Sequence, residues 1–197
     1  MPQGKIRKKS TEEQEIRALE LLRRVRRGDR GAFSELYKQY HPRLYGYLRR
    51  LLANPAAVDE VLDDVMFVVW TDARKYRGTA AVSTWIFGIA YRKALTAIRA
   101  DHRYQSRLDR KVDTDSVAGE RAKHGEWIQA ALLQLSPDHR QVVELTYYGG
   151  FSYREIADIA GCPVNTVKTR MFHARRRLKV LLPALAGQTK EQSRERA

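Results

Sequence analysis

The chain has 197 residues and a formal net charge of +14, and 43% of its residues are hydrophobic. This length suits one large domain or two small ones, and the positive charge favours nucleic acid or an anionic membrane surface as a partner. No apolar run is long enough to span a bilayer and no signal peptide is visible. The single cysteine, Cys162, excludes an intrachain disulfide and a cysteine-based zinc site. We therefore expect a cytoplasmic protein without membrane insertion.

Helical periodicity runs through the sequence and strand-like alternation is nearly absent, which predicts an all-α protein. We expect two small helical domains joined by a flexible linker. In the first half, helices are predicted near residues 16–25, from Asp29 to the Asn54-Pro55 break, and over 56–73 and 84–102. In the second half they are predicted near 127–135, 137–147, 153–160 and 164–182. The expected divisions are a basic N-terminal extension (1–25), a first domain (26–103), a linker (104–124), a second domain (125–186) and a polar tail (187–197).

The segment from Ser152 to Met171 has the pattern of a helix-turn-helix. Ser152 and Glu155 form an S-x-x-E capping box, which marks the start of the first helix. Gly161 follows that helix at the position where a positive φ is common. The four apolar residues Val167, Met171, Ala174 and Leu178 then recur at intervals of four, three and four, as one face of a second helix does.

The other side of this second helix is polar and basic, which suits entry into a major groove about 12 Å wide. The candidate DNA-contacting residues are Asn165, Thr166, Lys168, Thr169, Arg170, His173, Arg175, Arg176 and Arg177. The same pattern also fits an ordinary helical hairpin with a solvated basic face, and periodicity alone leaves both interpretations open.

In the first half, the segment VDEVLDDVMFVVW (58–70) places Glu60, Asp63 and Asp64 away from its apolar stripe, with Phe67 among them. An aromatic side chain within a rim of carboxylates is typical of a protein interface. A helix buried on most of its sides would also explain this segment. A metal site at Asp63 and Asp64 is less favoured, because adjacent side chains on a helix diverge by about 100°.

The segment from Ser83 to Arg103 carries a polar strip formed by Arg92, Thr96, Arg99 and Arg103. Such a strip suits contact with a phosphate backbone. Three aromatic residues, Trp70, Trp85 and Phe87, could stack on bases, although core packing is the favoured interpretation for all three.

Both halves of the sequence resemble a known family. The run from Leu135 to Leu178, LSPDHRQVVELTYYGGFSYREIADIAGCPVNTVKTRMFHARRRL, resembles domain 4 of the extracytoplasmic-function (ECF) class of bacterial sigma factors. The resemblance implies that this half reads the promoter −35 element through the candidate residues of the second helix. Thr169 and His173 stand where the family usually has Ser and Arg.

The first half resembles sigma domain 2. The segment around Phe67 is similar to the family's D-A-E-D-L-V-Q-E-T-F-L-R-A-W, which implies that Glu60, Asp63, Asp64 and Phe67 dock on polymerase. The segment 83–103 is similar to the family helix that reads the −10 element. The implied −10 residues are Tyr76, Arg77, Ser83, Arg92, Thr96, Arg99 and Arg103, with the loop from Tyr76 to Ser83 capturing an unstacked base.

The resemblance implies a sigma factor that binds RNA polymerase core, recognises and melts promoter DNA and starts transcription, with no catalytic, metal or cofactor site of its own. Its expected partners are the clamp of the largest polymerase subunit, the flap of the second subunit, and double- and single-stranded promoter DNA. An anti-sigma factor is a further candidate partner. The alternative is a helix-turn-helix regulator that dimerises through its first lobe, with a nuclease using Asp63 and Asp64 as a third reading.

Overall fold

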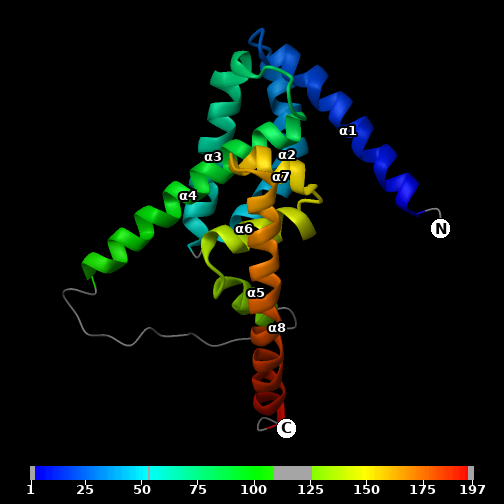
Figure 1. The fold of residues 1–197 in the computed structure, drawn as a ribbon. Coiled ribbons are helices and arrows are strands. Elements are labelled where there is room, and N and C mark those ends of the chain that lie inside the picture. Colours follow the sequence, from blue (N-terminus) through cyan, green and yellow to red (C-terminus); the bar gives the residue numbers. More distant parts are fainter. Residues whose placement is uncertain (1–2, 53, 109–125, 195–197) are drawn as a thin grey trace.

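The computed structural model describes the backbone of residues 3–52, 54–108 and 126–194, and these residues form helices and short connections without any strand (Figure 1). The first half contains α1 (Gln3–Val25), α2 (Arg30–Leu51), α3 (Pro55–Asp72), the short 3-10 helix η1 (Ala73–Lys75) and α4 (Val82–Leu108). The second half contains α5 (Glu126–Leu133), α6 (Pro137–Tyr147), α7 (Tyr153–Ala160) and α8 (Val164–Arg194). The predicted all-α fold with two helical lobes is confirmed.

Three helices are longer than their apolar patterns indicated. The first begins at Gln3 instead of near residue 16, α4 reaches Leu108, and α8 continues through Pro183 to Arg194. The stretch before residue 16 lacks proline after its second residue, and its Lys, Glu and Gln residues are good helix formers. The predicted linker therefore starts inside α4, and its remainder, residues 109–124, lies outside the described residues.

Several helix starts are fixed by polar side chains that accept otherwise unpaired backbone N–H groups. Asp29 accepts the N–H of Ala32 at 2.9 Å at the start of α2, and this bond, together with Arg24, lowers the pKa of its carboxyl. Asn54 accepts the N–H of Ala56 at the start of α3. These local caps fix where α2 and α3 begin.

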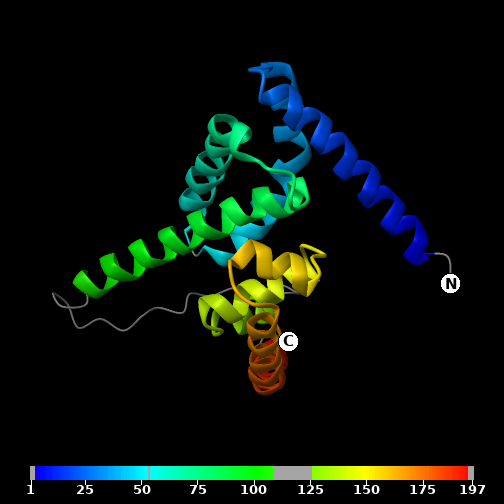
Figure 2. The ribbon, with the colours of Figure 1, turned by 45° about the horizontal axis from the view of Figure 1, so that its top comes forward.

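The first lobe is built around α4, which packs against α1, α2 and α3. Its core consists of fully buried side chains such as Leu22, Leu36, Leu48, Leu62 and Ile86. The N-terminal half of α1 and the C-terminal half of α4 extend away from this body in different directions, as the two views show (Figures 1 and 2). The second lobe packs α5, α6 and α7 against α8.

The apolar cores of the two lobes are continuous, because α4 also packs against α7 of the second lobe. The ring of Phe87 on α4 meets that of Phe151, just before α7, edge to face at 4.9 Å. The guanidinium of Arg43 on α2 lies over both rings, at 5.4 Å and 5.9 Å from their centroids. Aromatic pairs of this geometry stabilise a contact beyond the area that they bury.

Polar groups of the second lobe complete the C-terminal end of α2. Arg140 donates to the carbonyl of Leu51 and Gln129 donates to that of Arg50, each at 3.2 Å. The last carbonyls of a helix have no partner within it, so these bonds satisfy acceptors that would otherwise need water. Beside them, the fully buried carboxylate of Glu144 pairs with Arg50.

Glu144 couples this lobe contact to pH. Burial raises the pKa of its carboxyl above the usual 4.5, while Arg50 and Arg140 oppose the increase. The raised value means that the folded chain disfavours the ionised form on balance. The contribution of Glu144 to the free energy of unfolding is therefore greatest below about pH 4.5 and is lost as the pH rises through the pKa in the folded state.

We expect Glu144→Gln to be neutral or stabilising at pH 7, because the amide cannot ionise but still offers an oxygen to Arg50. Relative to the wild type, its melting temperature should increase as the pH is raised from about 4.5 to about 7. Thermal unfolding of both proteins across this range measures the difference. A variant that loses stability relative to the wild type as the pH rises would contradict the assignment.

Candidate nucleic-acid interface

The helix-turn-helix predicted from the sequence is present in α7 and α8. The hydroxyl of Ser152 accepts the N–H of Glu155 at 3.3 Å, and the carboxylate of Glu155 accepts the N–H of Ser152 at 2.8 Å. Gly161 ends α7 with φ of +63°, a left-handed conformation that side chains with a Cβ rarely adopt. The capping box and the glycine turn are therefore confirmed.

Helix α8 lies on its lobe through the predicted apolar face. Val167, Met171 and Ala174 are buried, and Leu178 is half-buried against the same core. This packing leaves the opposite side of α8 in solvent. The exposed candidate residues on it are Asn165, Lys168, Thr169, His173, Arg175, Arg176 and Arg177, and Thr166 is half-buried.

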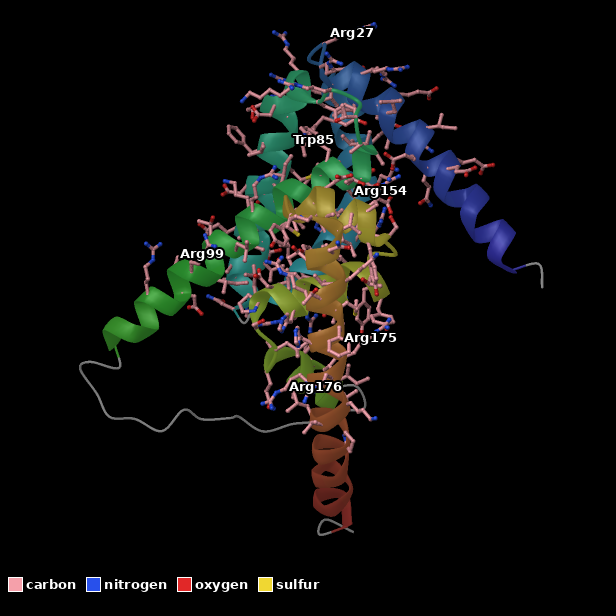
Figure 3. The ribbon with its side chains drawn as sticks, viewed as in Figure 1. Arg27, Trp85, Arg99, Arg154, Arg175 and Arg176 are labelled. Atoms are coloured by element: carbon pink, nitrogen blue, oxygen red, sulfur yellow. The ribbon has the colours of Figure 1, made fainter. Side chains whose placement is uncertain are left out.

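Figure 3 shows Arg175 and Arg176 projecting from α8. Arg175 donates to the hydroxyl of Tyr147 at 3.0 Å, and this hydrogen bond raises the pKa of its guanidinium. Thr169 donates its hydroxyl proton to the carbonyl of Asn165 at 3.0 Å, so its oxygen keeps acceptor capacity for a ligand. The exposed face therefore combines cations with short polar groups, as a groove-binding helix requires.

Arg170 differs from the other candidates on α8. It is half-buried, and it donates to the carboxylate of Asp138 on α6 at 2.7 Å. It also lies near Tyr91 on α4: burial and Asp138 raise the pKa of that phenol, and Arg170 opposes the increase. The structure thus holds this arginine at the junction of the two lobes.

Phe172, an aromatic residue on the same helix, belongs neither to the predicted apolar face nor to the candidate DNA-contacting residues. Its side chain is exposed and meets the ring of His173 edge to face at 5.4 Å. The sequence signal was available, because Phe172 lies outside the stripe that begins with Val167. A single exposed apolar residue is common on protein surfaces, so Phe172 alone indicates no contact.

The acidic segment of the first lobe lies on α3, with the side chain of Phe67 65% exposed. Glu60, Asp63 and Asp64 are exposed around it, and Asp64 pairs with Lys93 at 2.7 Å. A hollow of about 490 Å³ adjoins Phe67 between α2 and α3, and its lining residues are Arg30, Phe33, Tyr37, Asp63, Met66, Phe67 and Trp70. This patch, which we call the Phe67 patch, therefore offers an apolar centre with an acidic rim. The alternative interpretation of this segment, a helix buried on most of its sides, is therefore wrong.

The polar strip expected on α4 is exposed throughout, at Arg92, Thr96, Arg99 and Arg103. Arg99 lies on the part of α4 that extends beyond the lobe (Figure 3). Arg103 donates to the carbonyl of Arg99 at 3.2 Å, which turns its guanidinium along the helix. The strip and α8 therefore present cations on two different helices.

The residues of the loop that precedes α4 differ in their burial. Tyr76 and Ser83 are buried, with exposed fractions of 9% and 8%, whereas Arg77 is exposed. The hydroxyl of Tyr76 donates to the carbonyl of Ala80 at 2.6 Å. A hollow of about 630 Å³ opens beside this loop. It is lined by residues of the loop, of α4, including Arg92, of α7 and of the turn between α7 and α8.

The three aromatic residues considered for base stacking have separate environments. Phe87 is buried between Tyr47 and Phe151, so core packing is confirmed for it. Trp70 is half-buried and meets Phe33 edge to face at 5.2 Å. Trp85 is half-buried beside Tyr76 and lines the hollow next to the loop.

The described part of the chain shows neither a cluster of metal ligands nor a membrane-spanning helix. Among the residues whose side chains the structure describes (12–52, 54–101, 103 and 128–183), no three His, Cys, Asp or Glu side chains gather as metal ligands would. No helix in these ranges is both long and apolar enough to cross a membrane.

Comparison with known proteins identifies the family. Residues 36–104 match the model for Sigma-70 region 2, and residues 125–178 match the model for Sigma-70, region 4. The ECF RNA polymerase sigma factor SigK of Mycobacterium ulcerans is 31% identical over 176 residues, which cover 83% of this chain and 92% of that protein. The chain belongs to the family of ECF RNA polymerase sigma factors.

Related proteins support the same architecture. The SigK protein of Mycolicibacterium vanbaalenii is 31% identical over 82% of this sigma factor. The sigma factor RpoE from Bartonella quintana, solved with the anti-sigma factor NepR, is 26% identical with a TM-score of 0.64, covering 77% of this chain and 96% of RpoE. CnrH, solved with the cytosolic domain of CnrY, shares the fold with a TM-score of 0.64, covering 87% of this chain and 97% of CnrH, at 23% identity.

This sigma factor binds RNA polymerase core and promoter DNA and directs transcription initiation. A regulator that dimerises through its first lobe is not favoured, because both halves of the chain match sigma-factor regions. The regions also assign the two lobes: the first is sigma region 2 and the second is sigma region 4.

Proposed function

We propose that the Phe67 patch docks this sigma factor on the clamp of the largest polymerase subunit. The observation that carries the proposal is the exposure of a large aromatic side chain among the carboxylates of Glu60, Asp63 and Asp64. Removing such a ring from water on binding is strongly favourable, and the acidic rim selects a basic partner surface. The hollow beside Phe67 gives room for an apolar side chain of the partner.

The second part of the proposal concerns DNA. The strip of Arg92, Thr96, Arg99 and Arg103, with the loop residues Tyr76, Arg77 and Ser83, acts on the −10 element. Arg77 and the strip face solvent and can meet phosphates or bases, while buried Tyr76 and Ser83 shape the loop. The exposed side of α8 acts on the −35 element, with residues near its N-terminal end closest to base edges.

We propose residues 26–103 and 125–186 as the two domains, with 104–124 between them; α1 packs on the first domain through buried residues such as Leu22, and α4 continues beyond residue 103 to Leu108. Binding at two promoter elements by linked lobes increases the effective concentration of the second contact once the first has formed.

Catalysis belongs to the polymerase, so we propose no enzymatic activity for this chain and a cytoplasmic location with its polymerase. The RpoE complex with NepR supports an anti-sigma factor as a further partner. The second lobe is proposed to contact the flap of the second polymerase subunit, and this proposal rests on the family resemblance.

The experiment that tests the proposal is run-off transcription with purified polymerase core and a library of upstream sequences. The chain should support initiation without any other sigma factor and should enrich one pair of −35 and −10 elements. DNA binding without initiation, restored only when another sigma factor is added, would favour a regulator instead.

We expect Phe67→Ala to weaken binding to polymerase core by about 2 kcal/mol or more, close to a thirtyfold change, while leaving the melting temperature nearly unchanged. The reason is that Phe67 makes few contacts within the folded chain. Ile16→Ala is a matched control, because Ile16 is 62% exposed on a different helix of the same lobe. Equal loss of core affinity in both variants would refute a specific role for Phe67.

We expect Arg170→Ala to relax base preference at one position of the −35 element, by about 1–3 kcal/mol if Arg170 pairs with guanine. Arg176→Ala should weaken all −35 sequences about equally, because an exposed arginine farther along the helix meets phosphate. Asp138→Asn removes the carboxylate that holds Arg170 and should strengthen binding to the preferred sequence. Selections on randomised −35 duplexes with the three variants measure these effects, and a uniform loss for Arg170→Ala would contradict base reading.

A further inference from the structure

The start of α4 is completed by a side chain from a distant part of the sequence. Glu15 on α1 accepts the backbone N–H of Val82, and it accepts the N–H of Ser83 at 3.2 Å. The first N–H groups of a helix have no partner within it, and they carry the positive end of the helix dipole. A carboxylate from α1 therefore caps the N-terminus of α4. This role usually falls to the residue that directly precedes the helix in the sequence.

This contact is partly sheltered from water. Val82 and Ser83 are buried, and Glu15 itself is half-buried between α1 and the start of α4. Hydrogen bonds from backbone N–H groups to a carboxylate are stronger than those between neutral groups. Because water is partly excluded, replacing the carboxylate leaves these N–H groups without an equally good acceptor.

Helix α1 holds both ends of the segment between η1 and α4. At the first end, Arg74 of η1 donates to the carbonyl of Arg26, just beyond α1, at 3.4 Å. At the second end, Glu15 binds the start of α4. Between them, Tyr76 closes the loop through its bond to Ala80; burial raises the pKa of its phenol, and the charge of Glu15 raises it further.

The residues of this loop that face solvent are Arg77, Gly78 and Thr79. Their positions depend on the two fixed ends, because the loop itself contains no regular structure between Tyr76 and Ala81. Gly78 has φ of +74°, a conformation that residues with a Cβ rarely adopt, so a glycine suits the middle of the loop. A loop with fixed ends loses less conformational entropy when it binds a ligand than a loop with free ends.

We propose that Glu15 is a positioning residue for capture of single-stranded −10 DNA. It acts through the start of α4 and the loop, and an anionic side chain makes direct contact with phosphate unfavourable. The inference rests on the proposed role of this loop at the −10 element. It assigns a task to the N-terminal extension, whose C-terminal part otherwise packs on the first lobe.

The test compares Glu15→Ala and Glu15→Gln with Glu20→Ala. Glu20 is an exposed carboxylate of the same helix, so its variant loses the same charge without touching α4. Each variant is assembled with polymerase core. Three affinities are measured: for core, for a duplex carrying only the −35 element, and for a single-stranded non-template oligonucleotide carrying the −10 sequence enriched by run-off transcription.

Glu15→Ala should bind the oligonucleotide about tenfold more weakly than the wild type, with core and −35 duplex affinities unchanged. Glu15→Gln should lose less, because its amide oxygen still accepts hydrogen bonds, and Glu20→Ala should match the wild type. Wild-type affinity for the oligonucleotide in Glu15→Ala, or an equal loss of all three affinities, would overturn the inference. Thermal unfolding of the free Glu15→Ala variant is measured as well. If its melting temperature is lower than that of the wild type but the wild-type holoenzyme does not bind the oligonucleotide, the role proposed for the loop is wrong, and the inference is wrong with it.

Discussion

Both lobes depend on the burial of the first half of α4. Residues 86–91 are buried without interruption, so this part of the helix is enclosed on every side. Helices of the first lobe cover one part of its surface and α7 of the second lobe covers another. Gly88 faces α7, where an added Cβ would stand 3.8 Å from the Cα of Ile159, an ordinary van der Waals contact. Arg92, the first residue of the polar strip, is the first exposed residue after this buried stretch.

The distribution of charge follows from the same packing. Several carboxylates serve structural joints: Glu15 at the start of α4, Asp29 at the start of α2, and Glu144 and Asp138 near the junction of the lobes. The arginines of the α4 strip and most of those on α8 remain exposed. The surfaces proposed to meet DNA are therefore rich in exposed cations, although exposed arginines also lie on α1 and α2, while the exposed acids of α3 mark a different partner.

The sequence predicted best what depends on neighbouring residues. The capping box of Ser152 and Glu155, the left-handed Gly161 and the apolar face of α8 are all set within a few positions of one another. The outward position of Phe67 followed from one helical wheel in the same way. Its role in docking, like the other site assignments, stays a prediction until the binding experiments are made.

What the sequence did not reveal depends on residues that are far apart in the chain. The contact of Glu15 with Val82 spans 67 positions, and that of Arg50 with Glu144 spans 94. The pairing of Arg170 with Asp138 likewise depends on how α6 and α8 pack. Helical periodicity reports which side of a helix is apolar, but it does not identify the element that covers it. The extra length of α1 was missed because polar residues continue a helix without leaving an apolar stripe.

The contact between the lobes has a consequence for dissecting the molecule. A chain divided within residues 109–125 would yield two fragments whose surfaces are incomplete. The first fragment would expose the ring of Phe87 and leave the last carbonyls of α2 without Arg140 and Gln129. The second would expose Phe151 and bring Glu144 into water, where it would behave as an ordinary surface acid. The carboxyl resonance of Glu144 would report whether the two unsubstituted fragments, mixed in solution, had joined, and polar substitutions at Phe87 and Phe151 should prevent this joining.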